Sequence, residues 1–234
     1  MGYFINEVLS ENKIKFVSAC IIQSLKYIRH YKIIHRDLNY LNVMMDNKYY
    51  FNLIDFSYSV DFDKRKSKYL KCNGNDNNTP PEIRNNSEYS YNSDYFRLGN
   101  LIFFLVFKKY PWNLKQINNK TELIEIKNIK KNYSAELFDF INGLIKENIY
   151  ERLGYKDINE IINHPWFKGF NWKKLEKRKI ISPFINSKIK INIPFCRKFN
   201  KRLEKIYNYL QIRKSIYNSN LIKLFDYSKY DTFN

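Results

Sequence analysis

The chain has 234 residues, of which 44% are hydrophobic and 18% aromatic, a globular composition that excludes a disordered protein. This length is enough for one substantial core, or for one core with an appendage. The formal net charge of +18 comes with many Asn, Ile, Tyr and Phe residues and with lysines spread along the chain, so we interpret it as compositional bias. A nucleic-acid or anionic-membrane surface is the less favoured interpretation of this charge.

The first half of the chain predicts one helix followed by short strands. Apolar residues at spacings of three and four, from Ile14 to Ile28, predict an amphipathic helix over about 13–31. Ile33-Ile34 reads as a short strand before a polar turn. Two β-like runs, 43–45 and 49–54, are joined by "DNK" and predict a hairpin. The polar residues 58–82 predict a long loop, which in compact domains is usually functional or disordered.

The second half is predicted to be mostly helical. The expected elements are a buried helix over 95–107, a helix over 135–146 capped by Ser134, a helix from Asp157 that ends before His164, an irregular segment 170–197 and a basic helix near 198–214. The predicted fold class is therefore α+β, predominantly α-helical.

Three features predict the setting of the protein. No apolar run approaches the roughly 20 residues that span a bilayer, and the first residues lack the basic and apolar regions of a signal peptide. The cysteines Cys20, Cys72 and Cys196 are far apart, which suits neither a disulfide framework nor a zinc site. We therefore expect a reducing, intracellular and cytoplasmic location without a transmembrane segment.

The stretch "IIHRDLNYLNVMMD" carries the chemistry. His35-Arg36-Asp37, then Asn42, then Asp55-Phe56 is similar to the protein kinase catalytic core, in which an H-R-D-L-x-x-x-N loop precedes a D-F-G element. The resemblance implies that Asp37 accepts the proton of the substrate hydroxyl, while Asn42 and Asp55 hold Mg²⁺ and, with it, ATP. Arg36 and Asn39 complete the catalytic loop.

Arg36 has a second role in the family, where it contacts a phosphate on the activation loop. Ser67 and Tyr69 are the possible phosphate acceptors in this chain, although an unmodified basic loop explains the same stretch.

Downstream residues favour the protein-kinase form of this motif over kinase-like small-molecule phosphotransferases. "PPEI" resembles the A-P-E end of an activation segment, and Glu82 is matched by Arg152 of "ERLG", with which it would form a bidentate pair. Asp94 and Gly99 resemble the start of the central buried helix, where the Asp holds the backbone of the catalytic turn.

The stretch from Ile162 to Ile185 is similar to the end of the domain in the AGC group, the cyclic-nucleotide-dependent kinases and their relatives, including a short helix that begins at a Trp. The resemblance covers about 13–185. It implies a kinase-like C-terminal lobe with short β-hairpins at the catalytic cleft, in a domain over 1–169 that is truncated on its N-terminal side. An AGC-like C-terminal extension would follow over 170–234.

Four departures from the family pattern limit the expected activity. Only 34 residues precede His35 and none of the six glycines form a G-x-G, so the Gly-rich loop and the strand Lys of the ATP-binding lobe are not found. Asn39 replaces a Lys that approaches the transferred phosphate, and Ser57 replaces the Gly of D-F-G. The stretch "CNGNDNNT" lacks a recognisable platform for the substrate peptide.

Two hypotheses of different classes follow. The first is a serine/threonine protein kinase homologue that transfers the γ-phosphate of ATP to protein Ser or Thr, weakly or not at all as the isolated chain. The alternative is a pseudokinase-type module that binds a docking partner without phosphotransfer. The oligomeric state is left open.

Overall fold

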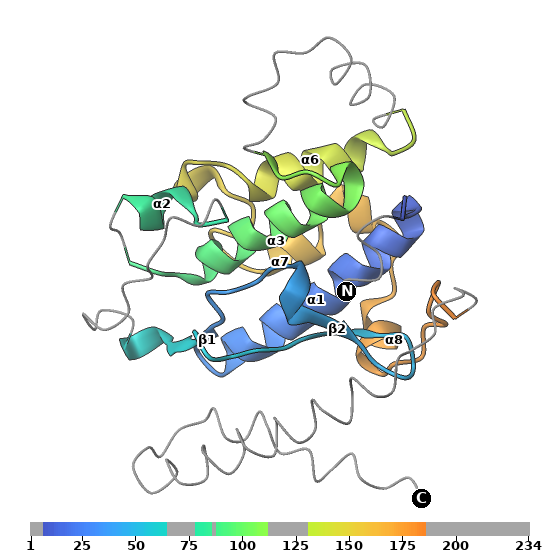
Figure 1. Ribbon diagram of the computed structural model, residues 1–234, viewed down its shortest axis with the longest axis horizontal. Coiled ribbons are helices and arrows are strands. Elements are labelled where there is room, and N and C mark those ends of the chain that lie inside the picture. The colour runs from blue at the N-terminus through green and yellow to red at the C-terminus, as the bar shows by residue number, and fades with distance from the viewer. Residues whose placement is uncertain (1–6, 65–77, 86–87, 112–130, 186–234) are drawn as a thin grey trace, which may run out of the picture. The chain divides into compact units, whose positions relative to one another are not determined.

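The computed structural model describes residues 7–64, 78–85, 88–111 and 131–185. These residues belong to one compact unit, Met1–Ser187, while a second unit, Lys188–Asn234, lies outside the described residues together with the predicted helix near 198–214. The described part is mostly helical with a few short strands, as the α+β prediction requires (Figure 1).

Helix α1 (Glu11–His30) confirms the predicted amphipathic helix, and it begins where the Ser10 side chain accepts a hydrogen bond from the Lys13 N–H. Its buried face includes all five predicted apolar positions, namely Ile14, Val17, Ile21, Leu25 and Ile28. This face packs against α3 and against the strands that carry the candidate site.

Two small antiparallel pairs follow α1. The predicted hairpin is formed by β2 (Val43–Met45) and β3 (Phe51–Leu53), with Val43 opposite Leu53. Strand β1 (Ile33–Ile34) pairs instead with β4 (Val60–Asp61), so the predicted loop over 58–82 is wrong at its start. Val60 is the reason, because it packs in a cluster with Ile34 and Tyr89, and a two-residue strand has no periodic pattern to predict it.

The predicted loop is also interrupted near its two ends. A 3₁₀ turn, η3 (Phe62–Lys64), follows β4, and a short helix, α2 (Pro81–Arg84), contains the end of "PPEI". Residues 65–77, which include Ser67 and Tyr69, lie outside the described residues.

Helix α3 (Tyr91–Phe107) is buried along almost its whole length and lies beside α6 (Ala135–Leu144) (Figure 1). It begins four residues earlier than predicted, because Ser90 and Ser93 form a capping box. Gly99 permits the close approach of the two helices, since a Cβ there would lie 2.6 Å from Ile145 Cγ2. The Ser134 cap of α6 is confirmed by its hydrogen bond from the Leu137 N–H.

The chain then turns through η5 (Ile149–Glu151) into α7 (Asn159–Ile162) and η6 (Pro165–Phe167). The helix predicted from Asp157 is confirmed in place, with the Asp157 carboxylate accepting from the Asn159 N–H at 2.7 Å. The predicted irregular segment contains one short helix, α8 (Trp172–Glu176), which Asn171 caps and which agrees with the family resemblance.

One carboxylate, which the sequence did not suggest, joins three of these elements. Glu11 at the start of α1 accepts hydrogen bonds from the Ser134 N–H at 2.7 Å, from the Ser134 hydroxyl at 2.5 Å and from Trp166 Nε1 at 2.8 Å. Burial alone would raise the pKa of Glu11, but the donors from Ser134 and Trp166 outweigh this effect and lower it below its usual value.

Within the described ranges, no helix is both long and apolar enough to cross a membrane. Cys20 is a free thiol buried in α1, and burial raises its pKa to about 12.

We predict that Glu11→Gln lowers the free energy of unfolding at pH 7 by about 1–2 kcal/mol, because charge-assisted hydrogen bonds are lost. Since the pKa of Glu11 is lowered by folding, its stabilisation is fully present above its unfolded pKa and is lost as the pH falls through the folded pKa. The difference between the two proteins in urea unfolding should therefore shrink as the pH is lowered through and below about 4.

The matched control is Glu176→Gln, which removes an exposed carboxylate at the end of α8 and should leave unfolding unchanged within about 0.5 kcal/mol. A Glu11→Gln protein as stable as the wild type at pH 7 would contradict the assigned role of this carboxylate.

Candidate active site

One buried carboxylate of helix α3, that of Asp94, holds the catalytic turn by hydrogen bonds to its backbone. Asp94 accepts a hydrogen bond from the His35 N–H at 2.7 Å and another from the Arg36 N–H at 2.8 Å. Burial raises the pKa of Asp94, and the two N–H donors act in the opposite direction. The family resemblance assigned this contact to Asp94, and the geometry agrees with it.

These two hydrogen bonds hold a strained backbone. Arg36 has φ of +70°, a left-handed conformation that residues other than Gly rarely adopt and that the surrounding structure must support. The turn then places Asp37, partly exposed, at its far side.

The His35 ring fixes the turn to the next strand. Its Nδ1 accepts from the Asp37 N–H at 3.2 Å, so the ring proton lies on Nε2, which faces the Ile54 carbonyl at 3.1 Å. The ring also meets Phe56 edge-on, with centroids 4.8 Å apart. Burial lowers the pKa of His35, which keeps the imidazole neutral in this role.

Two amides orient the Asp37 carboxylate. Asn42 Nδ2 donates to Asp37 Oδ2 at 2.7 Å and to the Asp37 carbonyl at 2.8 Å, while Asn39 Nδ2 donates to Asp37 Oδ1 at 3.1 Å. Both Asp37 oxygens therefore have a neutral donor, and the Asn42 amide is turned so that its Oδ1 points away from Asp37.

Asn39 also builds the turn that carries Asn42. Its Oδ1 accepts from the Leu41 N–H at 2.8 Å and from the Asn42 N–H at 3.2 Å, which caps the 3₁₀ turn η2 (Tyr40–Asn42). The residue that replaces the family's Lys is therefore structural here, which its sequence position alone did not predict.

Asp55 lies beside Asn42 because of the hairpin register. The Ile54 N–H donates to the Asn42 carbonyl at 2.9 Å, at the end where β2 begins and β3 finishes. Asp55 has φ of +62°, and its carboxylate is exposed. Ser57 holds one carboxylate oxygen, since its hydroxyl donates to Asp55 Oδ1 at 2.7 Å. The structure thus joins Asp37 to Asn42 through side-chain hydrogen bonds and places Asp55 one residue after Ile54, whose backbone pairs with Asn42.

The Arg36 side chain packs on an aromatic ring. Its guanidinium is buried and lies 4.3 Å from the centre of the Tyr89 ring, a cation–π geometry. Its predicted contact with a phosphate at Ser67 or Tyr69 falls on residues outside the described part of the chain and stays a prediction.

The predicted pair between Arg152 and Glu82 is present. Arg152 Nη1 donates to Glu82 Oε1 at 2.7 Å and Nη2 donates to Oε2 at 2.8 Å, and the Arg152 side chain is fully buried. Further hydrogen bonds to the Asn92 and Lys146 carbonyls satisfy the guanidinium. This pair ties α2 to α3 and to the turn after α6.

Two hydrogen bonds that the sequence did not predict connect the catalytic loop to helix α3. Asn78 Nδ2 donates to the Leu38 carbonyl at 3.0 Å, and Asn100 Nδ2 of α3 donates to Asn78 Oδ1 at 2.9 Å. No pattern signals such a chain, because single Asn side chains from distant segments form it.

The residues after α8 pack on the hairpin that carries the site. The Tyr50 hydroxyl donates to the Ile180 carbonyl at 2.7 Å, the Ser182 hydroxyl donates to the Tyr49 carbonyl at 2.9 Å, and Arg178 pairs with Asp46. Phe184 is fully buried, with its ring centre 5.0 Å from that of Phe51. Residues 178–184 therefore pack closely against the β2–β3 hairpin.

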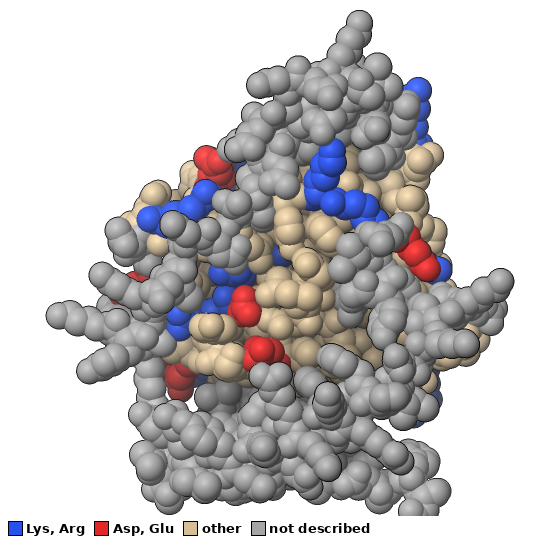
Figure 2. All heavy atoms as spheres, viewed as in Figure 1, with Lys and Arg blue, Asp and Glu red and all other residues tan. Residues whose placement is uncertain are grey.

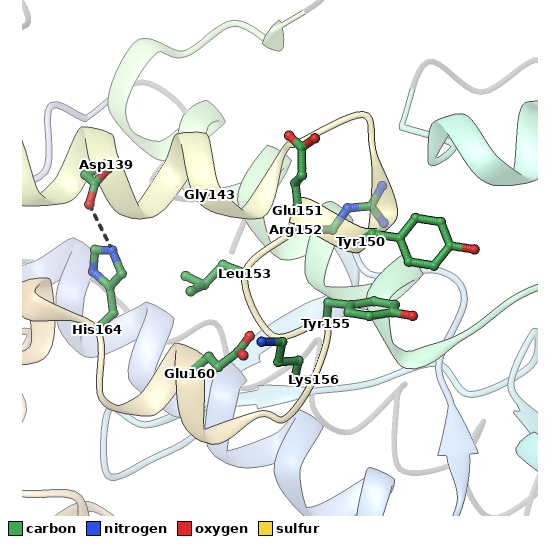
Figure 3. Close-up of a pocket in the computed structure, with 10 residues that line it drawn as sticks. All are labelled: Asp139, Gly143, Tyr150, Glu151, Arg152, Leu153, Tyr155, Lys156, Glu160 and His164. Atoms are coloured by element: carbon green, nitrogen blue, oxygen red, sulfur yellow. Dashed lines mark ion pairs between the residues drawn. The ribbon is translucent and has the colours of Figure 1, made fainter.

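A cavity of about 320 Å³ lies elsewhere, between α6, the turn that contains Arg152, and α7 (Figure 3). Its rim carries the Asp139–His164 pair and the exposed Tyr150. None of the predicted site residues lines it.

The donor set near Asp37 fits a divalent cation bound with phosphate. Mg²⁺ prefers hard oxygen ligands and is commonly bound by one or two protein oxygens together with substrate phosphates. Asn42 Oδ1 and Asp55 provide such oxygens. Among the described residues, no group of three or more His, Cys, Asp or Glu side chains is placed to hold a metal ion.

Comparison with known proteins agrees with this geometry. The family model for the protein kinase domain matches residues 3–167. The human cGMP-dependent protein kinase 2 is 29% identical over 175 residues, which are 72% of this chain and 23% of that protein. The serine/threonine-protein kinase sgk-1 of Caenorhabditis elegans is 31% identical over 180 residues, which are 75% of this chain and 39% of that protein.

A Drosophila melanogaster cGMP-dependent protein kinase, isozyme 1, is 29% identical over 181 residues and is covered to 23%. The chain thus spans roughly a quarter to two fifths of the length of these curated relatives. They agree with the resemblance to the cyclic-nucleotide-dependent kinases, and the family match covers more than half of the chain. The chain belongs to the protein kinase family.

Proposed function

We propose that this chain provides the C-terminal lobe of a serine/threonine protein kinase, which transfers the γ-phosphate of ATP to a Ser or Thr of a protein. The observation that carries the proposal is the arrangement of Asp37, Asn42 and Asp55, which the catalytic turn and the hairpin bring together. Protein kinases use ATP with a divalent metal, and Mg²⁺ when bound neutralises charge on the phosphates.

Asp37 is the proposed proton acceptor. A carboxylate that is held by two amides keeps a fixed direction, so it can orient a substrate hydroxyl and accept its proton. Asn42 Oδ1 and the Asp55 carboxylate would hold the metal. The Gly that the family has at position 57 provides backbone freedom. Ser57 would instead fix the Asp55 carboxylate through its hydroxyl.

Weak turnover of the chain by itself is part of the proposal. Asn39 has no positive charge to offset the transferred phosphate, and its side chain is occupied in capping η2. The given sequence contains no G-x-G motif, and no strand Lys that would bind the phosphates of ATP can be identified in it. Loss of one charge-stabilising donor typically lowers a rate by about 10²–10³-fold.

A second candidate function is a pseudokinase-type docking module in a cytoplasmic assembly. The same engagement of Asn39 favours it, because a site without the phosphate-binding ammonium can keep its shape and serve as a binding surface. The AGC-like extension proposed over 170–234 is compatible with both functions. The two functions differ in whether Mg²⁺ and nucleotide bind together.

We predict that ADP with Mg²⁺ raises the midpoint of thermal unfolding by about 3–6 °C at ten times the dissociation constant, and that ADP without Mg²⁺ does not. Asp55→Asn should abolish the Mg²⁺-dependent part, because a carboxylate ligand is lost. Asp139→Asn, which neutralises an exposed carboxylate at the remote cavity, is the control and should behave as the wild type. No Mg²⁺-dependent shift in the wild type would support the docking module instead.

We further predict that Asn39→Lys raises phosphate transfer from ATP to a generic Ser/Thr acceptor by about 10²-fold, because an ammonium is restored beside the phosphate while Asn42 still holds Asp37 Oδ2. The same change should lower stability by about 1 kcal/mol, since the cap of η2 is lost. Radiolabelled transfer and urea unfolding measure the two effects.

Asn47→Lys adds the same charge at an exposed turn and should change neither rate nor stability by much. Equal transfer by the Asn39→Lys protein, the Asn47→Lys protein and an Asp37→Ala protein would argue against phosphotransfer in this site.

A further inference from the structure

Ser57 occupies one of the two carboxylate oxygens of Asp55. Its hydroxyl donates to Asp55 Oδ1 at 2.7 Å, and its N–H donates to the same oxygen at 3.3 Å. A carboxylate oxygen offers about two acceptor positions, so both positions on Oδ1 are used. Within the described residues, the hydrogen bonds of this carboxylate fall on Oδ1 and not on Oδ2. Ser57 therefore leaves Asp55 a single oxygen for a ligand.

The hydroxyl of Ser57 is also what fixes the direction of this carboxylate. Asp55 and Ser57 are both exposed, so packing does not hold the Asp55 side chain in place. Asp55 adopts a left-handed backbone conformation, whereas Ser57 does not. Position 57 of this chain therefore does not need the backbone freedom of a Gly, and a side chain with a hydrogen-bonding group can stand there.

Asn42 likewise offers a single oxygen. Its Nδ2 is engaged twice, by the Asp37 carbonyl at 2.8 Å and by Asp37 Oδ2 at 2.7 Å. A side-chain amide has only one oxygen, which here is its end opposite to Asp37. A cation that binds between Asn42 and Asp55 would therefore receive one oxygen from each residue.

This small number of oxygens suits Mg²⁺ better than Ca²⁺. Mg²⁺ takes six ligands at about 2.0–2.1 Å, keeps several waters and needs only one or two protein oxygens beside the phosphates of a nucleotide. Ca²⁺ takes about six to eight oxygens at about 2.3–2.6 Å and can use both oxygens of one carboxylate. Because Ser57 occupies Asp55 Oδ1, the two-oxygen mode that would favour Ca²⁺ is blocked.

The charge of the whole chain increases the weight of each carboxylate. The net charge of +18 disfavours cations in general, so a cation must be attracted by groups close to it. Figure 2 shows acidic side chains in only a few places on one face of the described residues, among basic and uncharged ones. The way in which one carboxylate is presented can therefore decide which cation binds.

We infer that Ser57 is a positioning residue that makes Asp55 a one-oxygen ligand and thereby selects Mg²⁺ over Ca²⁺. The inference rests on the proposed kinase function and names a residue that sets the metal preference of the same site. Ser57 acts through Asp55 and does not itself bind the cation.

The test measures the binding of a fluorescent ADP analogue while Mg²⁺ or Ca²⁺ is titrated at a constant nucleotide concentration. The preference is the ratio of the two half-saturating concentrations, and calorimetry gives the same ratio for the free nucleotide. The wild-type preference should exceed that of the free nucleotide roughly tenfold or more, since removing a group that hydrogen-bonds a metal ligand typically lowers metal affinity by about 10–100-fold. Ser57→Ala should remove this excess, and Ser57→Thr, which keeps the hydroxyl, should retain it.

Ser59→Ala is the matched control, because it removes a hydroxyl of the same loop that donates to the His35 carbonyl and not to Asp55. It should keep the wild-type preference. A preference that survives in Ser57→Ala, that is lost in Ser57→Thr, or that equals the preference of the free nucleotide in the wild type would overturn the inference. Mg²⁺-dependent nucleotide binding by the wild type leaves the kinase proposal standing when the inference fails, and its absence removes both.

Discussion

The site depends on the carboxylate of Asp94. A carboxylate buried in the first turn of a central helix is costly unless its oxygens accept hydrogen bonds, and here two backbone N–H groups of the catalytic turn supply them. The same bonds hold Arg36 in a left-handed conformation that the residue would not adopt alone. The helix and the turn therefore satisfy each other, and Asp37 is positioned as a result.

The other parts of the site extend from this contact. The neutral His35 ring connects the turn to the Ile54 carbonyl, and the hairpin register then brings Asp55 beside Asn42. The buried pair of Arg152 and Glu82 fixes the position of the short helix α2. A buried pair of this kind is chiefly a positional constraint, because its desolvation offsets much of its attraction. The fold thus holds Asp37 and Asn42 in one fixed arrangement, while Asn39 lacks the charge that the family resemblance assigns to its position.

Sequence reasoning reached the features that have a period or a family motif. The repeat from Ile14 to Ile28 predicted α1 to within two residues, and the motifs predicted the contacts of Asp94 and Arg152. It did not reach contacts that single side chains make over long separations. Glu11 accepts a hydrogen bond from Trp166, which lies 155 residues later in the sequence. Val60 forms a strand only because Ile34 and Tyr89 pack beside it. It assigned Asn39 a lost charge but could not show its capping role, which depends on the local turn geometry.

We propose above all that Asn42 and Asp55 bind a divalent cation together with a nucleotide beside Asp37. Paramagnetic Mn²⁺ in place of Mg²⁺ tests it most directly, because it broadens the NMR signals of nearby amides in isotope-labelled protein. With ADP present, the amides of Asn42, Ile54 and Asp55 should broaden at the lowest Mn²⁺ concentrations, and without ADP they should not. Broadening that ignores ADP, or that appears first around the cavity at Asp139, would contradict the account.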